Sequence, residues 1–458
     1  MSTQTRPQQY WSIYEDTPPT YHPSNTQQQS IPLNTYPRQP VSTTTVYCPP
    51  KRKSKGNSIK TFLTCLCTLA VLGGAGAGIY FLVRPQPFPT PPGPVLPVMP
   101  ADLDGYRGII LGADIDWSKE SPSYFNDRTG HKSANFGNFY YISDTLKAGS
   151  LDRTARQTME QGAIVTVTVM PSDGLAVVSD AALDELAKTC ADLNGKGAQI
   201  MLRFGHEMNG NWYKYGQDPQ AYVSLWRRMA TRVRAATNRT ALVWAPNTAG
   251  GYPFPGGAYT PSKADPRFDQ MDTNKDGVLN SQDDPFTPYY PGDTYVDWIG
   301  ISAYYFGPGT SGSNTTSASP NVLPKDDEFL YYIDPLYRFA RERNKLFAVS
   351  ETGVSFYKAN EGKPGQAGEV EMKRKWIGLV YNRTVFETHP LLRAISWFDY
   401  LKEEYGSLRD FRLTGNDEVG SIFRSKIEEL NRINGTIILA QHPLVAAGNG
   451  TSGRNNTG

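Results

Sequence analysis

The chain is poor in cysteine and nearly balanced in charge. It has 4 cysteines in 458 residues, and because Cys48, Cys65 and Cys67 precede residue 84, Cys190 is alone in the remainder. A disulfide within that remainder is excluded, so it must be stable through its own core. A formal net charge of +2 argues against a nucleic-acid partner, which would need a strongly basic surface.

The stretch RFGHEMNGNWYKYG, from Arg203 to Gly216, lacks the second histidine of a zinc protease. That signature, H-E-x-x-H, requires a histidine four residues after the first. The residue four after His206 is Gly210. The carboxylate of Glu207 therefore needs another role, and we expect no cofactor for the chemistry.

Charged residues are absent from Thr61 to Val83. A helix of this length crosses a hydrocarbon core of about 30 Å, and it starts too far along the chain for a cleavable signal peptide. Basic residues precede the run, whereas Arg84 alone follows it closely, and these flanks argue against a buried core helix. The positive-inside rule then predicts a single-pass type II membrane protein, with the bilayer as partner and the later residues extracellular or in the secretory-pathway lumen.

Glycosylation sequons point to the same topology. Every N-x-[ST] follows the apolar run, which predicts a glycoprotein; the sequons begin at Asn238, Asn314, Asn382, Asn434, Asn449 and Asn455. Composition divides the rest of the chain. Residues 1–60 are predicted to be a disordered cytosolic tail, 61–83 the transmembrane helix, 84–100 a proline-rich stalk, 101–440 the folded domain and 441–458 a disordered tail.

Within residues 101–440, short apolar runs alternate with amphipathic helical stretches. The runs cover residues 107–113, 163–170, 198–204, 241–246, 296–302, 346–350 and 392–398. Continuously apolar runs predict strands buried on both faces, in a parallel sheet covered by helices. The repeated order of strand and helix predicts an α/β fold of the (β/α)8 TIM-barrel type. The runs supply seven of the eight strands that such a barrel needs, and the missing one is expected in the ambiguous segment 135–143.

Two glutamates follow predicted strands of this barrel. Glu207 comes after the fourth strand and Glu351 directly after the seventh. Because active sites of such barrels lie at the C-terminal ends of the strands, both carboxylates are expected in one cleft. Two carboxyl groups are the minimum for glycoside hydrolysis, one to protonate the leaving oxygen and one to attack the anomeric carbon. A single glutamate at a strand end is more often an ion-pair partner, and the joint occurrence favours catalysis.

A family resemblance rests on several motifs. The segments RFGHEMNGNWYKYG, VWAPN, YYPGDTYVDWIGISAYY, AVSETG and ISWFD resemble, in this order, glycoside hydrolase family 26, best known for endo-β-1,4-mannanases on a (β/α)8 barrel. The resemblance implies that Glu207 is the general acid/base and Glu351 the nucleophile of a retaining double displacement. It further implies that His206 lies beside the acid, that Tyr304 hydrogen-bonds the nucleophile and that Trp397 lies beneath the sugar at the cleavage point.

The residues agree with these implied roles. A proton donor needs a raised pKa, which burial against rings such as Trp212 would provide, while hydrogen bonds would keep Glu351 ionised. Aromatic faces beside the acid also suit the apolar faces of pyranose rings. Packing under a loop is the alternative for Trp212, and a barrel core layer is the alternative for Trp397.

The substrate remains open at this point. Tyr213 and Tyr215 stand where family mannanases are richer in tryptophan, and Met170 and Pro171 stand where several have a second histidine. We therefore expect a β-1,4-mannan-type polysaccharide as the substrate partner, with mixed-linkage β-glucan or β-xylan as alternatives on the same scaffold. A membrane-anchored receptor that binds carbohydrate without cleaving it is the alternative from another class, and the two convergent carboxylates argue against it.

A second motif, DTNKDGVLNSQD, is independent of the first. It fits the D-x-[DN]-x-[DN]-G calcium loop and resembles the repeats of cellulosomal dockerins, with a solvated acidic turn as the alternative. It predicts a structural Ca²⁺ held by Asp272, Asn274, Asp276, the Val278 carbonyl, Asn280 and Asp283.

Overall fold

The computed structural model describes residues 108–308, 320–404, 407–432 and 437–440. The predicted transmembrane segment 61–83, the tail 1–60, the stalk 84–100 and the tail 441–458 lie outside these ranges and stay predictions. Among the residues that are described, none of the helices combines the length and the apolar character needed to cross a bilayer.

Parallel strands close into a barrel. Going round it, the order is β1, β10, β8, β7, β6, β5, β4 and β2, and β2 pairs with β1 to complete the circle. Their bounds are β1 (Ile109–Ile115), β2 (Asn135–Ile142), β4 (Ile164–Met170), β5 (Ile200–Phe204), β6 (Thr240–Trp244), β7 (Trp298–Tyr305), β8 (Leu346–Val354) and β10 (Leu392–Asp399). The predicted (β/α)8 barrel is confirmed, and the ambiguous segment 135–143 supplies its second strand.

Short strands extend and flank the barrel. β3 (Leu146–Lys147) and β13 (Ile437–Ile438) lie at the edges of the same sheet. A separate antiparallel sheet combines β9 (Phe356–Tyr357), β11 (Leu401–Glu404) and β12 (Ser407–Asp410). This second sheet follows β8 and β10 in the chain, so it belongs to the end of the barrel where those strands finish.

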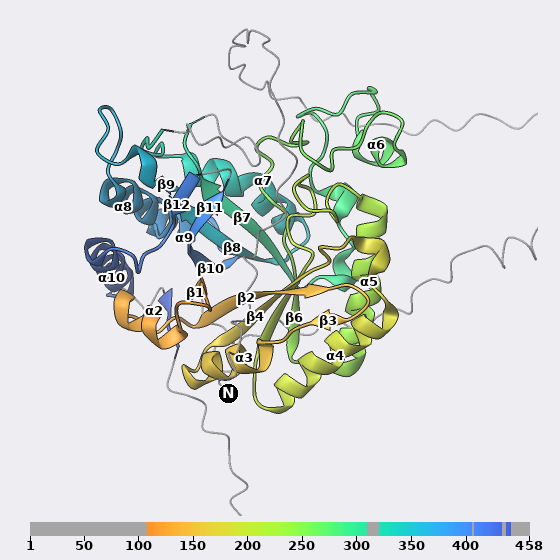
Figure 1. The fold of residues 1–458 in the computed structure, drawn as a ribbon, viewed down its shortest axis with the longest axis horizontal. Helices are drawn as coiled ribbons and strands as arrows, with labels where there is room; N and C mark the ends of the chain where they lie inside the picture. The colour runs from red at the N-terminus through yellow and green to blue at the C-terminus, as the bar shows by residue number, and fades with distance from the viewer. Residues whose placement is uncertain (1–107, 309–319, 405–406, 433–436, 441–458) are drawn as a thin grey trace, which may run out of the picture. The chain divides into compact units, whose positions relative to one another are not determined.

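Helices surround the barrel on the outside (Figure 1). They are α2 (Pro122–Thr129), α3 (Leu151–Glu160), α4 (Asp180–Gly195), α5 (Pro219–Ala236), α6 (Pro266–Met271), α7 (Glu328–Glu342), α8 (Glu369–Val380), α9 (Arg383–Thr388) and α10 (Asp417–Asn431). Several begin at a side-chain cap: Ser179 accepts from the N–H of Ala182 at the start of α4. Asp218 does the same for α5, whose first residue is Pro219. Such caps satisfy N–H groups that a helix start leaves free.

The barrel interior changes from apolar to polar along its axis. A cluster of buried residues that includes Ile110, Met201 and Trp298 fills the part nearest the strand starts. Further along, Asn135 donates to Ser396 Oγ at 3.2 Å and accepts from Thr166 Oγ1 at 2.8 Å. Hydrogen bonding makes these buried polar groups tolerable. Charged residues appear beyond this layer, toward the C-terminal ends of the strands.

Candidate active site

Glu207 lies in a tight turn directly after β5. Gly205 and Glu207 have φ angles of 52° and 54°, a left-handed conformation that glycine adopts freely and that strains glutamate. The N–H of Glu207 donates to the carbonyl of Ala245, just past β6, at 2.7 Å. The neighbouring strand therefore holds the strained residue in place.

Neutral donors hold the Glu207 carboxylate. The indole Nε1 of Trp212 donates to Oε2 at 2.8 Å, and the amide of Asn247 donates to Oε1 at 2.9 Å. The side chain is 7% exposed. Burial raises the pKa of Glu207, and the negative charge of Glu351 raises it further, although the Arg203 charge and the Asn247 hydrogen bond lower it in part. A carboxyl group in this environment is suited to keep a proton.

Asn247 is fixed by a reciprocal pair of hydrogen bonds. The N–H of Asn247 donates to Asn209 Oδ1 at 2.8 Å, and the Asn209 amide donates to the Asn247 carbonyl at 3.0 Å. Asn209 follows Glu207 in the same turn. The segments after β5 and β6 thus lock each other, and Asn247 is held at the acid.

A β-bulge sets the direction of Glu351. In the pairing with β7, Ile301 lies opposite Val349 whereas Ser302 lies opposite Glu351, so Ser350 is the extra residue. The pairing with β10 skips at the same point of β8. A bulge breaks the alternation of side chains between the two faces of a strand. The prediction placed Glu351 just after its strand, whereas β8 continues to Val354 and the glutamate lies inside it.

A cation and a phenol hold Glu351. Arg203 Nη2 forms an ion pair with Oε1, and the Tyr304 hydroxyl donates to Oε2. Arg203 and Glu351 are 1% and 2% exposed. A buried carboxylate needs such a partner, because an isolated charge away from water costs several kcal/mol. The expected hydrogen bond from Tyr304 to Glu351 is present in the structure.

His206 directly precedes Glu207 in the chain, and its ring lies close to Glu351. Its Nε2 is 3.9 Å from Glu351 Oε1 and 3.4 Å from the Tyr213 hydroxyl. Burial lowers the pKa of His206 well below its usual value, and the positive charge of Arg203 lowers it further. The ring is therefore neutral at physiological pH and adds no charge beside Glu351.

The rings after Glu207 have different surroundings. Trp212 is half-buried, with its ring 5.0 Å from that of Phe254. Tyr215 is fully buried and donates to the His206 carbonyl at 2.9 Å, while Tyr213 is half-buried and stacks on it at 4.9 Å. Tyr215 thus supports the turn, and Trp212 and Tyr213 keep exposed surface beside the acid.

Trp397 is fully buried in this structure. Its indole Nε1 donates to the Phe411 carbonyl at 2.8 Å. The Phe411 ring lies 5.6 Å from that of Tyr304, which connects Trp397 to the neighbourhood of Glu351. Contact of Trp397 with sugar stays a prediction.

The structure brings Glu207, Glu351, His206, Trp212 and Tyr304 into one network, which also includes two residues that the sequence analysis did not single out. Arg203 is the ion-pair partner of Glu351, and Asn247 is the partner of Glu207. A lone arginine within the apolar run 198–204 was a signal for the first. Asn247 is the last residue of the VWAPN motif, and nothing local in the sequence indicates that it reaches Glu207.

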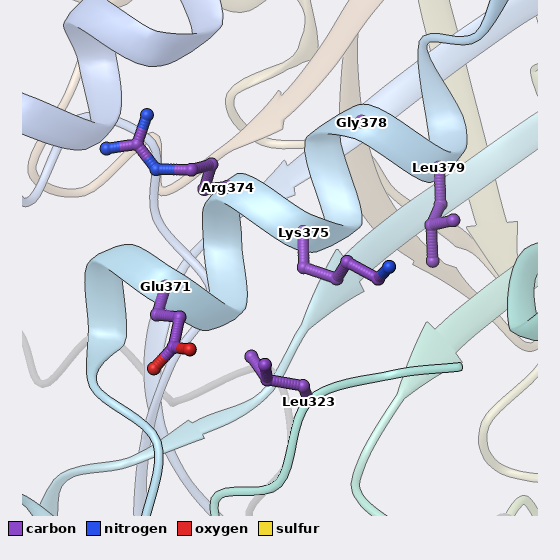
Figure 2. A pocket seen from close by; sticks show the side chains of 6 residues that line it. All are labelled: Leu323, Glu371, Arg374, Lys375, Gly378 and Leu379. Atoms are coloured by element: carbon purple, nitrogen blue, oxygen red, sulfur yellow. The ribbon is translucent and has the colours of Figure 1, made fainter. Parts of the chain in front are cut away.

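A pocket of about 380 Å³ lies away from this network. It is formed by Leu323 and by residues of α8, among them Arg374, Lys375 and Leu379 (Figure 2). None of the carboxylates discussed above lines it. The size of this pocket therefore says nothing about the candidate active site.

The predicted calcium loop lies in the long connection between β6 and β7. Asp272 accepts from the N–H groups of Asp276 and Gly277 at 3.2 and 2.9 Å, and Asp283 accepts from those of Thr273 and Asn280 at 2.8 and 2.9 Å. Within the described ranges, no three His, Cys, Asp or Glu side chains are grouped so that they could hold a metal ion. Calcium at this loop stays a prediction.

Comparisons with known proteins agree with the geometry. Residues 156–261 match the family model described as Glycosyl hydrolase family 26. A mannan endo-1,4-β-mannosidase A and B of Caldalkalibacillus mannanilyticus is 27% identical over 132 residues, and a mannan endo-1,4-β-mannosidase of Bacillus subtilis is 25% identical over 185 residues. These matches support glycosyl hydrolase family 26. Glu207 lies inside the matched residues, whereas Glu351 lies beyond them.

The matched relatives are longer proteins. The two alignments cover 27% and 38% of this chain but only 20% and 36% of the relatives. An endoglucanase H of Acetivibrio thermocellus is 22% identical over 53% of this chain and 21% of its own length. The catalytic domain of a Bacillus sp. endo-β-1,4-mannanase of family 26 is similar in structure, with a TM-score of 0.47 at 16% identity over 77% of this chain and 96% of that one.

Proposed function

We propose that this chain is a retaining, endo-acting glycoside hydrolase that cleaves β-1,4-mannan-type polysaccharide. The observation that carries the proposal is that two buried carboxyl groups of one barrel have partners of different charge. Glu207 has neutral donors, Trp212 and Asn247, and a raised pKa. Glu351 has a cation, Arg203, and the Tyr304 hydroxyl. Environments that differ in this way support Glu207 as the acid and Glu351 as the nucleophile.

The proposed reaction has two steps. First, an oxygen of Glu351 attacks the anomeric carbon, the glycosidic C–O bond breaks, and the leaving oxygen takes the proton of Glu207. The products of this step are a glycosyl ester on Glu351 and a shortened polysaccharide. In the second step Glu207 accepts a proton from water, whose oxygen attacks the same carbon and releases Glu351. The two inversions leave the configuration unchanged.

Other side chains prepare these steps. Arg203 balances the charge of Glu351 before the attack, and Tyr304 fixes the second carboxylate oxygen, so that Oε1 and Oε2 are not free to rotate. His206 is neutral and does not compete with Arg203 for Glu351. Trp212 holds Glu207 through its indole N–H and offers half-buried ring surface beside it. Aromatic surface of this kind suits the apolar face of a pyranose ring.

The test is hydrolysis by the full-length chain of galactomannan, glucomannan, lichenan and xylan. We expect release of oligosaccharides from the mannans, with the β-anomer as the first product in a time-resolved NMR spectrum. Glu351→Ala should abolish release, while Glu361→Ala, which changes an exposed glutamate of the following loop, should leave it unchanged. Release that survives Glu351→Ala would refute the assigned nucleophile.

Hydrolysis of β-glucan is the second candidate activity. The similarity to an endoglucanase over 53% of the chain is the observation that favours it. Lichenan cleavage without mannan cleavage would establish this alternative. No product from any of the four polysaccharides would refute the enzyme and favour the carbohydrate-binding receptor.

A further inference from the structure

A single hydroxyl group lies between the half-buried carboxyl group of Glu120 and the buried one of Asp399, near the ends of β1 and β10. Thr414 Oγ1 is 2.9 Å from Glu120 Oε1 and 2.5 Å from Asp399 Oδ2. Glu120 belongs to the loop between β1 and α2, and Asp399 is the last residue of β10. Both distances are within hydrogen-bond range. The hydroxyl has one proton and can donate to one of the two oxygens only.

The other contact therefore requires a second proton on a carboxyl group. If both groups were ionised, one carboxylate oxygen would face the lone pairs of Thr414 without a donor. Asp399 already accepts from the N–H groups of Leu413 and Thr414, which suits an ionised carboxylate. Glu120 Oε2 is buried and has no hydrogen-bond partner within the described residues. The proton thus belongs on Glu120 Oε1, which donates to Thr414 while Thr414 donates to Asp399.

Asp399 and Thr414 hold a turn, residues 411–414, that reaches the candidate active site. The Phe411 carbonyl accepts the indole N–H of Trp397 at 2.8 Å. The Phe411 ring packs edge-on against the ring of Tyr304, with centroids 5.6 Å apart. Tyr304 in turn donates to Glu351. A displacement of the turn would therefore move the group that orients the proposed nucleophile.

We propose that Glu120 and Asp399 share one proton across the Thr414 hydroxyl, and that this proton fixes the turn 411–414 behind Tyr304 and Trp397. Glu120 is then a positioning residue for the reaction, although it lies in a loop that contributes no group to the substrate chemistry. The inference rests on the proposed function, because Tyr304 matters only if Glu351 reacts. The shared proton itself does not depend on that function.

Neighbouring charges are consistent with a proton at this position. Burial and, next, the negative charge of Asp399 raise the pKa of Glu120, against the Thr414 hydrogen bond and the charge of Arg412, and the net result is a pKa of about 7. Asp116 of the same loop also raises the pKa of Glu120. Burial raises the pKa of Asp399 too, and the charge of Lys373 from α8 lowers it in part.

A second anchor holds the same loop. α2, which follows Glu120, lies beside α10 (Figure 1). Arg128 at the end of α2 donates to the Thr414 carbonyl at 2.9 Å and pairs with Asp417. These contacts do not involve the shared proton. The loop therefore stays attached when Glu120 ionises, and the expected change is a local loosening of the turn.

The test compares the wild-type chain with Glu120→Gln across pH. The amide of glutamine donates to Thr414 at every pH, whereas the protonated fraction of a group with a pKa of about 7 falls about tenfold between pH 6 and pH 8. We expect the ratio of kcat/KM at pH 8 to that at pH 6 to be about threefold to tenfold higher in Glu120→Gln. Asp152→Asn, which neutralises an exposed carboxylate on α3, is the control and should retain the wild-type profile.

Thr414 provides an independent variant. Thr414→Val keeps the shape and removes the hydroxyl, so we expect kcat to fall while KM changes little. Thr414→Ser restores the hydroxyl and should restore kcat. Superimposable pH profiles for wild type and Glu120→Gln would overturn the positioning role. Equal activity of Thr414→Val and Thr414→Ser would do so as well.

A readout without substrate separates this inference from the proposed function. Because the folded-state pKa of Glu120 is raised, the proton stabilises the fold fully below the unfolded value and this stability is lost as pH rises through about 7. The Tm of the wild type should therefore fall more steeply between pH 5 and pH 8 than that of Glu120→Gln. Parallel Tm curves would refute the shared proton, whether or not the chain hydrolyses any polysaccharide.

Discussion

Glu207 and Glu351 are both almost fully buried, yet the groups that hold them differ in charge. Glu207 follows a strand in a strained turn and receives hydrogen bonds from an indole and an amide, neither of which is charged. Glu351 lies inside a strand, is turned by a bulge and meets a guanidinium. The first environment favours a carboxylic acid and the second a carboxylate. Identical side chains can thus serve as proton donor and nucleophile because their partners differ in charge.

The largest expected effect is on kcat, and its dependence on the leaving group should distinguish the two glutamates. Glu351→Ala removes the proposed nucleophile and should reduce kcat on any substrate on the order of 10⁴-fold or more. Glu207→Ala removes the proposed proton donor, and such a group contributes about 10²–10⁴-fold to the rate when the leaving group needs a proton. On an aryl glycoside with an acidic phenol as leaving group, Glu207→Ala should slow the first step much less. Similar losses for both variants on both substrates would contradict the separate roles.

Substitutions of the same two residues should change the free energy of unfolding in opposite directions. Glu351→Gln leaves Arg203 buried without its counter-ion and should destabilise the fold by about 3–5 kcal/mol. Glu207→Gln removes a buried group whose raised pKa makes its ionisation unfavourable, so it should stabilise the fold by about 1 kcal/mol, increasingly as pH rises from 5 to 8. Chemical denaturation at several pH values measures both. A loss of stability in both variants would refute the difference in environment.

Asn247→Ala should change the environment of Glu207 and leave that of Glu351 unchanged. The Asn247 hydrogen bond lowers the pKa of Glu207, so its removal should move the alkaline limb of kcat/KM to higher pH. Loss of the oriented contact should also reduce kcat, about fivefold to tenfold for one hydrogen bond to a buried group. The acidic limb should not move, since the Asn247 amide donates to Glu207 whereas Glu351 is held by Arg203 and Tyr304. A shift of the acidic limb instead would show that the two carboxyls are not independently held.

The smallest effect concerns the segment between β6 and β7. If the loop 272–283 binds Ca²⁺, it anchors the connection that also carries Asn247. Replacing Asp272 and Asp276 by alanine should then lower the Tm by a few °C in the presence of calcium, which corresponds to a loss of about 1–2 kcal/mol in the free energy of unfolding. With a chelator present, the replacement should not change the Tm. Melting curves that are the same with calcium and with chelator, in the wild type, would refute the calcium site.

The strands were predictable because their signal is local. A parallel barrel strand is buried on both faces, so a run such as 241–246 is apolar without alternation. The segment 135–143 was ambiguous for a physical reason. Asn135 belongs to the polar layer of the interior, whereas Asn138, on the opposite face of the strand, donates to the Tyr140 hydroxyl, and both interrupt the apolar pattern. The positions of Glu207 and Glu351 near strand ends followed from the same strand assignments.

The partners of those glutamates were not predictable in the same way. Arg203 reaches Glu351 across 148 positions of the chain, and no spacing in the sequence encodes that pairing. The bulge at Ser350 also left no local mark, since it depends on two neighbouring strands. The shared hydroxyl of Thr414 joins residues that lie 294 and 15 positions away.

The sequence by itself determined the class of fold, the two carboxylates and the aromatic residues beside one of them, because periodicity and motif order are properties of neighbouring residues. Only the tertiary structure decided which carboxylate receives a cation and which receives neutral donors. It also decided that Tyr215 supports a turn while Trp212 keeps exposed surface. Burial and charge pairing act through space, and closure of the barrel brings together groups that the chain keeps far apart.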